Sequence, residues 1–217
     1  MRTKNLLALL GALTLIPAAL GGNTASAQAA TTACTSSDDV RALQQRLSHL
    51  HFATGPIDGC DGPRTTSALL AFQKAKGLSV DGDAGPLTRA ALKRGGRPVT
   101  VRDRSKGTHV EIDVRHQLLT LVKDGTPWRI YNATTGAPGH ETPQGSFTIE
   151  RKYVRDWSVP YRTWMPYASY FTDDGVAIHA GVVGTAPASH GCVRVSDSFA
   201  ADVFRATPVG TRVLVSD

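Results

Sequence analysis

One short stretch brings together the side chains of this chain that could carry out acyl transfer. Between Ala177 and Val195 lie two histidines, His179 and His190, and one cysteine, Cys192. A free thiol has a pKa of roughly 8.5, so Cys192 needs a neighbouring base to react near neutral pH. Glycines allow sharp turns and close approach of backbone N–H groups to a bound carbonyl, and here they are Gly181, Gly184 and Gly191. The pattern favours a nucleophile, a base and an oxyanion hole.

Two other interpretations of the same residues stay open on chemistry alone. His179, His190 and Cys192 could supply three zinc ligands, although the spacing of the last two is unusual for zinc. Cys192 could instead be a buried core residue, as free cysteines often are. The nucleophile is the favoured interpretation of the three.

Two ordered motifs then resemble the L,D-transpeptidase catalytic domain. His179 followed by the run Ser189-His190-Gly191-Cys192-Val193-Arg194 is similar to that family's catalytic signature. The segment Thr142-Pro143-Gln144-Gly145-Ser146-Phe147 resembles its Thr-Pro-x-Gly-x-Phe motif. The resemblance covers roughly residues 108–216.

The resemblance implies a role for each residue of the signature. Cys192 would be the nucleophile and His179 the proton acceptor and donor, with the carbonyl of Ala180 orienting the imidazole. The oxyanion and orienting groups would come from Ser189, His190, Gly191 and the N–H of Cys192. Arg194 would bind a substrate carboxylate, with an ion pair to Asp197 as the alternative.

The implied reaction acts on peptidoglycan. The thiolate would attack a tetrapeptide stem, expel D-alanine, and pass the acyl group to an amine of a neighbouring stem, giving a 3→3 cross-link. Water as the acceptor would make the enzyme an L,D-carboxypeptidase, and a catalytically inactive wall-binding protein is a third possibility. No metal and no organic cofactor is expected.

The first residues predict export. Arg2 and Lys4 precede an apolar run, and Ala25-Ser26-Ala27 fits a cleavage site, so residues 1–27 are interpreted as a secretory signal peptide. We therefore expect a secreted, cell-wall-associated monomer without stable membrane insertion. The formal net charge of +6 is diffuse, and no basic cluster interleaves with aromatic residues, which argues against a nucleic-acid partner.

Residues 34–94 contain an internal repeat that predicts a small helical domain. The run from Asp58 to Thr65 matches the run from Asp81 to Thr88, each a turn with a proline near a helix start. Helices are expected over about 38–50, 65–76 and 86–93. The Asp-rich turns do not fit a calcium loop, since Leu92 stands where an EF-hand needs Glu. Through Leu43-Gln44, Gly55-Pro56-Ile57-Asp58-Gly59, Phe72-Gln73 and Gly77-Leu78-Ser79-Val80-Asp81-Gly82, the segment resembles the three-helix peptidoglycan-binding domain. A merely structural helical domain is the alternative.

The cysteines agree with an exported protein. Cys34 and Cys60 bracket the first expected helix, and a disulfide between them would stabilise the fold by roughly 3–4 kcal/mol. Cys192 is then left as a free thiol, which favours a reactive role.

After a linker at residues 95–107, the residue pattern changes from one typical of helices to one typical of β-strands. Alternating and hairpin patterns predict a mostly β catalytic domain over 108–217, with one helix near 196–204. The predicted fold class is therefore multi-domain, α plus mainly β: a three-helix peptidoglycan-binding domain followed by an L,D-transpeptidase-type domain. Aromatic residues gather over 153–171, either as core or as the wall of a substrate cleft. Met165 and Tyr167 are the expected cleft-wall residues.

Overall fold

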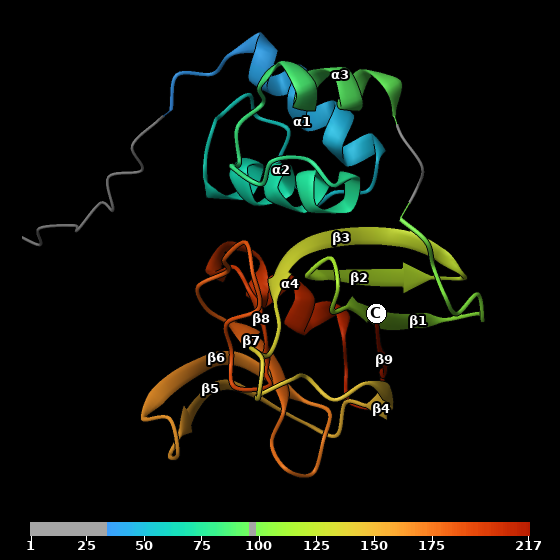
Figure 1. The fold of residues 1–217 in the computed structure, drawn as a ribbon, viewed down its shortest axis with the longest axis vertical. Helices are drawn as coiled ribbons and strands as arrows, with labels where there is room; N and C mark the ends of the chain where they lie inside the picture. The colour runs from blue at the N-terminus through green and yellow to red at the C-terminus, as the bar shows by residue number, and fades with distance from the viewer. Residues whose placement is uncertain (1–33, 96–98) are drawn as a thin grey trace, which may run out of the picture. The chain divides into compact units, whose positions relative to one another are not determined.

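The computed structural model describes residues 34–95 and 99–217, and the expected signal peptide lies outside the described residues. Three helices come first: α1 (Asp38–His49), α2 (Pro63–Lys76) and α3 (Pro86–Arg94) (Figure 1). Prolines occupy the first positions of α2 and α3, where the missing N–H has no helical acceptor to lose. The left-handed Gly77, with φ of 60°, ends α2. These helices form the helical domain.

The rest of the chain is mostly β, so the expected fold class is confirmed. Nine strands form one curled sheet in the order β4-β9-β1-β2-β3-β8-β7-β6-β5. Their bounds are β1 (Thr108–Asp113), β2 (Leu118–Lys123), β3 (Thr126–Thr134), β4 (Gly145–Thr148), β5 (Arg151–Ser158), β6 (Thr163–Tyr170), β7 (Ala177–Ala180), β8 (Val193–Val195) and β9 (Arg212–Ser216). One helix, α4 (Asp197–Ala206), follows β8 and buries Phe199, Ala200 and Val203. The strands and α4 form the β domain.

The helical domain and the β domain share part of their apolar core. Leu118 and Ile130 of the sheet are buried in the same hydrophobic cluster as Leu47 and Phe72 of the helices. The segment after α1 also pairs with β3, since the N–H of Ala53 donates to the carbonyl of Ile130 at 3.0 Å. This pairing covers backbone groups of β3 that would otherwise be an open edge.

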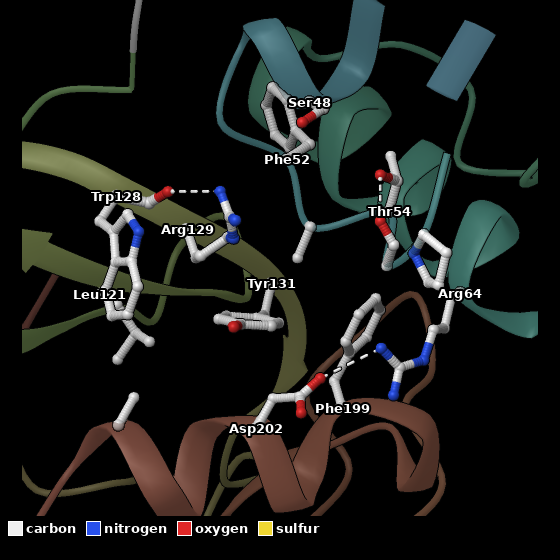
Figure 2. A pocket seen from close by; sticks show the side chains of 14 residues that line it. Ser48, Phe52, Thr54, Arg64, Leu121, Trp128, Arg129, Tyr131, Phe199 and Asp202 are labelled. Atoms are coloured by element: carbon white, nitrogen blue, oxygen red, sulfur yellow. Dashed lines mark hydrogen bonds and ion pairs between the residues drawn. The ribbon is translucent and has the colours of Figure 1, made fainter. Parts of the chain in front are cut away.

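An ion pair also joins the two domains. Arg64 of α2 lies 3.1 Å from a carboxylate oxygen of Asp202 on α4, beside the rings of Tyr131 and Phe199 (Figure 2). Both charged side chains are about one-third exposed. A pair at this exposure contributes little stability by itself, so its value is to fix where the Arg64 guanidinium lies.

The internal repeat of the helical domain is a repeated hydrogen-bond arrangement around two buried glutamines. The Gln44 amide bonds to side-chain and backbone groups of the first turn and of α2: Asp58, Gly59, Cys60 and Thr65. The Gln73 amide makes the same set of bonds in the second copy: Asp81, Gly82, Asp83 and Thr88. Each glutamine therefore fixes one turn to the start of the helix that follows it.

Replacing Gln44 with leucine should lower the free energy of unfolding by about 2–4 kcal/mol. The change removes four hydrogen bonds and leaves the N–H of Gly59 buried without an acceptor. Gln45→Leu is the matched control, because Gln45 is exposed on the same helix and should cost under about 0.5 kcal/mol. Urea unfolding of both variants measures the difference. Equal midpoints for the two variants would contradict a structural role for the Gln44 network.

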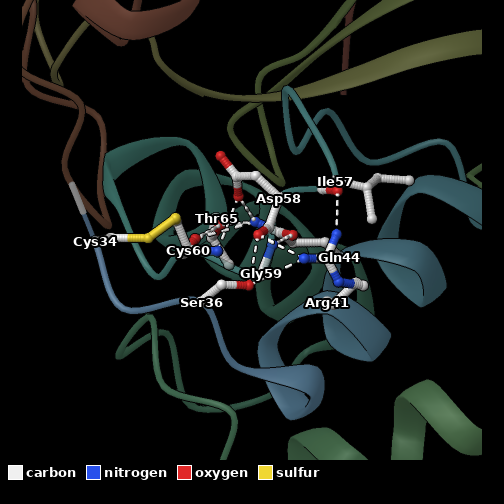
Figure 3. The surroundings of a disulfide bond; sticks show 9 residues. All are labelled: Cys34, Ser36, Arg41, Gln44, Ile57, Asp58, Gly59, Cys60 and Thr65. Carbon is white, nitrogen blue, oxygen red and sulfur yellow. Dashed lines mark hydrogen bonds between the residues drawn. A yellow bond between two sulfur atoms is a disulfide. The ribbon is translucent and has the colours of Figure 1, made fainter. Parts of the chain in front are cut away.

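A disulfide ties the segment before α1 to the first turn. Cys34 is bonded to Cys60, as the cysteine positions predict, and Cys192 is the free thiol of the described chain (Figure 3). Ser36 reinforces the connection by donating to the carbonyl of Asp58 at 2.9 Å. In the chain-entropy account, the bond stabilises the fold by restricting the unfolded chain.

Candidate active site

The pairing of β7 with β8 directs the histidine and the cysteine to the same face of the sheet. The two strands are parallel, with Ile178 opposite Val193 and His179 opposite Arg194. Ile178 and Val193 are buried in the hydrophobic core. Side chains alternate along a strand, so His179 and Arg194 point to the other face, and Cys192 projects with them. Cys192 directly precedes β8 and is therefore a diagonal neighbour of His179 on this face.

One hydrogen bond fixes the orientation of the His179 ring. Its Nδ1 lies 2.7 Å from the carbonyl oxygen of Ala180, an acceptor that requires the proton on Nδ1. The Nε2 atom is then left with its lone pair, which is what a proton acceptor needs. Burial, together with the nearby positive charge of Arg194, lowers the pKa of His179, while the bond to Ala180 opposes this shift. The imidazole is therefore neutral at pH 7.

The Cys192 thiol is also neutral in the resting protein. Burial raises the pKa of the thiol, and this effect exceeds the opposing contributions of the Ala177 backbone and the Arg194 charge. The sulfur lies against a small apolar cluster that contains Met165, Ala168 and Tyr170. A neutral thiol and a neutral imidazole that line one cleft can react by transferring the proton during attack, without a preformed ion pair.

The loop before Cys192 is held by hydrogen bonds from two directions. The Ser189 hydroxyl donates to the carbonyl of Cys192 and accepts the N–H of Gly191 at 3.1 Å. Thr142, in the connection from β3 to β4, donates to the carbonyl of Gly191 at 2.7 Å and accepts the N–H of Gly136 at 3.0 Å. Thr142 is buried, and the feature of the sequence that indicates its importance is the Thr-Pro-x-Gly-x-Phe segment. That segment therefore supports the loop that leads into Cys192.

A cleft of about 350 Å³ opens over these residues. His179, Cys192, Arg194 and His190 line one part of it, and Tyr161, Trp164 and Met165 of the β5–β6 hairpin line another. Tyr161 and Trp164 are about half exposed, so part of the aromatic cluster forms a wall and does not fill the core. The Tyr167 ring instead packs against Phe204 of α4, with centroids 5.8 Å apart. Tyr167 is absent from the cleft lining, whereas Met165 is part of it.

Comparison with known proteins identifies the family. The model of the L,D-transpeptidase catalytic domain matches residues 107–215, half of the chain. The chain belongs to the L,D-transpeptidase family. A peptidoglycan-binding domain model matches residues 36–92, which contain α1, α2 and all but the last two residues of α3.

Solved and curated relatives agree with this assignment. An L,D-transpeptidase of Xylanimonas cellulosilytica is 38% identical, with a TM-score of 0.72 over 84% of this chain and 95% of that one. One from Stackebrandtia nassauensis is 27% identical, with a TM-score of 0.55 over 85% and 94% of the two chains. L,D-transpeptidase 3 of Mycobacterium tuberculosis is 26% identical, and the match covers 64% of this chain and 57% of that protein. An N-acetylmuramoyl-L-alanine amidase of the same organism is 42% identical over only 18% of its length. The chain thus spans less than two thirds of these curated relatives.

His190 and Arg194, two further residues of the signature, also line the cleft. The exposed His190 ring lies between His140 and Tyr161, with centroids 4.8 Å from each. Arg194 is half-buried and, within residues 34–95 and 99–217, forms no ion pair with Asp197. Its guanidinium charge therefore faces the cleft without a protein counter-ion.

The described residues offer no group of three His, Cys, Asp or Glu side chains that could hold a metal ion. Within the same ranges, no helix is long and apolar enough to cross a membrane.

A buried lysine of the helical domain contacts the loop between β7 and β8. Lys74 of α2 donates from Nζ to the carbonyls of Ala133 at 3.0 Å and Gly184 at 2.8 Å. Gly184 belongs to the loop that leads from His179 to Cys192, and its own N–H donates to the Thr134 hydroxyl. The pKa of Lys74 falls from 10.5 to about 8 because the ammonium is buried.

Lys74→Met should lower turnover by about tenfold, because the loop carrying Cys192 loses one of its supports.

The Lys74→Met substitution should also change how the free energy of unfolding depends on pH. Between pH 8 and about 10.5 the folded wild-type chain binds fewer protons at Lys74 than the unfolded chain, so this residue makes unfolding free energy rise with pH. The variant lacks that rise.

Urea midpoints of wild type and Lys74→Met at pH 7.5 and pH 10 measure this effect. Lys93→Met, at an exposed position of α3, is the matched control and should behave as wild type in both assays. If the urea midpoints of wild type and Lys74→Met differ by the same amount at pH 7.5 and pH 10, the prediction is wrong.

Proposed function

We propose that this chain is a cysteine transpeptidase that forms 3→3 cross-links between peptidoglycan stems through an acyl-enzyme. The observation that carries the proposal is the common orientation of His179 and Cys192 toward one cleft, with Nδ1 of His179 engaged by Ala180. This leaves Nε2 free to take the thiol proton as the sulfur attacks.

The first half-reaction forms the acyl-enzyme. A bond forms between Sγ of Cys192 and the carbonyl carbon of the third residue of a tetrapeptide stem, while the thiol proton moves to Nε2 of His179. The C–N bond to D-alanine then breaks, and His179 gives the proton to the leaving amine. The thioester that remains keeps the acyl group activated for transfer.

The second half-reaction transfers the acyl group. The side-chain amine of a neighbouring stem attacks the thioester carbonyl, a C–N bond forms and the C–S bond breaks. The proton lost by the amine passes through His179 back to the sulfur, which restores the neutral pair.

Backbone N–H groups stabilise the oxyanion in both steps. The N–H of Gly191 already donates to the Ser189 hydroxyl, so the hole is assigned to the N–H groups of Cys192 and His190. The left-handed Gly191, with φ of 109°, gives the loop the turn that this arrangement needs. Ser189 and Thr142 then act by holding the loop.

Arg194 is assigned to a stem carboxylate. Its guanidinium lines the cleft and has no ion-pair partner among the described residues, and a carboxylate can accept two parallel hydrogen bonds from it. The expected signal peptide and the match to a peptidoglycan-binding domain support a location outside the cytoplasm, on the cell wall.

Product analysis tests this function. The purified enzyme is incubated with a disaccharide-tetrapeptide, and the products are read by mass spectrometry. A cross-linked dimer with release of D-alanine supports transpeptidation, and a disaccharide-tripeptide alone indicates the carboxypeptidase reaction. If neither product forms, the proposed catalysis is wrong.

A further inference from the structure

A second cavity of about 350 Å³ lies where the helical domain meets the β domain, away from His179 and Cys192. Three of its lining residues come from one strand, β3: Trp128, Arg129 and Tyr131. Arg64 of α2 and Phe199 and Asp202 of α4 line the opposite part, as Figure 2 shows. No step of the proposed reaction uses this cavity.

A β-bulge places two consecutive residues of β3 at the cavity. The pairing of β2 with β3 runs from Leu121 opposite Arg129 to Val122 opposite Pro127, so Trp128 is an extra residue. Consecutive strand residues normally face opposite sides of a sheet, but here Trp128 and Arg129 line the same cavity. Bulges are features that redirect side chains, often beside functional sites.

The polar groups of the cavity are fixed in place, yet incompletely used. Arg64 is positioned by Asp202, by the Phe199 ring 4.8 Å below its guanidinium, and by close contact with Gly55. Within the described residues, Arg129 donates only to the backbone of Trp128. Several N–H donors of both guanidinium groups thus remain available to a ligand.

We propose that this cavity binds the glycan strand of peptidoglycan, through its N-acetylated amino sugars. The inference rests on the proposed function, which makes peptidoglycan the partner. Trp128 is 41% exposed and offers a flat ring for the apolar face of a pyranose. Arg64 and Asp202 put donors and an acceptor side by side, which suits hydroxyl and acetamido groups that donate and accept at once.

The site is built from both domains. Asp202 pairs with Arg64 and with Arg205, so both of its carboxylate oxygens lie at fixed positions. A stem peptide, whose carboxylates can also pair with the Arg129 guanidinium, is the competing ligand. Residues of both domains are needed, so the helical domain alone holds an incomplete site.

Ligand titration of the chain carrying Cys192→Ala tests the proposal without turnover. The probes are N-acetylglucosamine tetramer, which is a peptide-free glycan, and the free tetrapeptide, each followed by two-dimensional NMR. The tetramer should bind, with affinity lowered about tenfold by Trp128→Ala and also lowered by Arg129→Ala. Trp128→Phe keeps an aromatic plane and should retain most of the binding. Arg89→Ala, at an exposed arginine of α3, is the matched control and should bind as the parent does.

Three results would overturn the proposal: no binding of the tetramer, equal binding by parent and Trp128→Ala, or binding of the tetrapeptide in its place. Far-UV circular dichroism checks that each variant is folded. Turnover of the disaccharide-tetrapeptide by the unsubstituted chain separates the two hypotheses. Turnover without tetramer binding rejects only the glycan site, whereas tetramer binding without turnover rejects only the catalytic function.

Discussion

Replacing Cys192 with alanine should lower turnover by at least about 10⁴-fold and leave the fold intact. In the proposed reaction the sulfur forms the covalent intermediate, and Cys192 supplies the free thiol of the cleft. The thiol is half-buried against a small cluster, so losing one atom should cost only about 1 kcal/mol of stability.

Intact mass spectrometry provides the direct measurement. Wild-type enzyme quenched in acid during turnover should carry the mass of the stem acyl group, and Cys192→Ala should carry no adduct. Thr163→Ala, at an exposed position of the cleft wall, controls for a general disturbance of the site and should still form the adduct. An alanine variant that keeps more than a few per cent of the activity would refute the nucleophile assignment. Chelators should have no effect on the wild-type rate.

The helical domain shows how far sequence patterns reach. The repeat and its prolines predict α2 and α3 because turn and cap chemistry are local, and the spacing of apolar residues predicts α1. Cys34 and Cys60 could be paired because they bracket a short segment. The roles of Gln44 and Gln73 were not predictable in this way. Gln44 lies 14 residues before Asp58, whereas Gln73 lies 8 before Asp81, so the two glutamines fall outside the repeat of the turns.

Tyr167 shows why the aromatic cluster resisted prediction. Met165 and Tyr167 were both expected on the cleft wall because they come shortly before the strand that carries His179, and a regular strand would place them on the same face. Tyr167 adopts a left-handed backbone with φ of 57°, and its ring packs on α4 instead. Left-handed residues other than glycine are rare and depend on tertiary packing, so periodicity does not reveal them. The bulge at Trp128 depends on strand register in the same way.

The residues of the candidate active site could be predicted from the sequence for a different reason. The motif that resembles the family signature singles out His179 and Cys192, and an aliphatic run predicts the strand at His179, whereas β8 after Cys192 was not predicted. Their common face follows from register, which the sequence does not state. The link from Lys74 to Gly184 joins residues 110 positions apart, and nothing local in either segment indicates it.

His179→Ala and His190→Ala should respond to pH in opposite ways. In wild type, the acylation rate should fall on the acid side with a midpoint below 6.5, because burial lowers the pKa of His179 and protonation removes the base. Without this imidazole, the rate depends on the thiolate fraction. Burial raises the pKa of Cys192 above 9.0, so less than about 1 in 100 molecules is ionised at pH 7.

The His179→Ala variant should therefore acylate about 10²–10⁴-fold more slowly than wild type at pH 7, and its rate should still be climbing at pH 9.

His190→Ala removes a ring that packs between His140 and Tyr161, next to the loop that leads into Cys192. Its rate should fall by about tenfold at every pH, without alkaline recovery, because a misplaced loop is not repaired by ionising the thiol. His116→Ala, on an exposed turn of the β domain, is the matched control and should follow the wild-type profile. Rapid-quench acylation with the disaccharide-tetrapeptide from pH 5 to pH 10 measures all four proteins. Alkaline recovery in His190→Ala, and its absence in His179→Ala, would mean that the base is His190, and the assignment made from Ala180 and the β7–β8 register would have to be reversed.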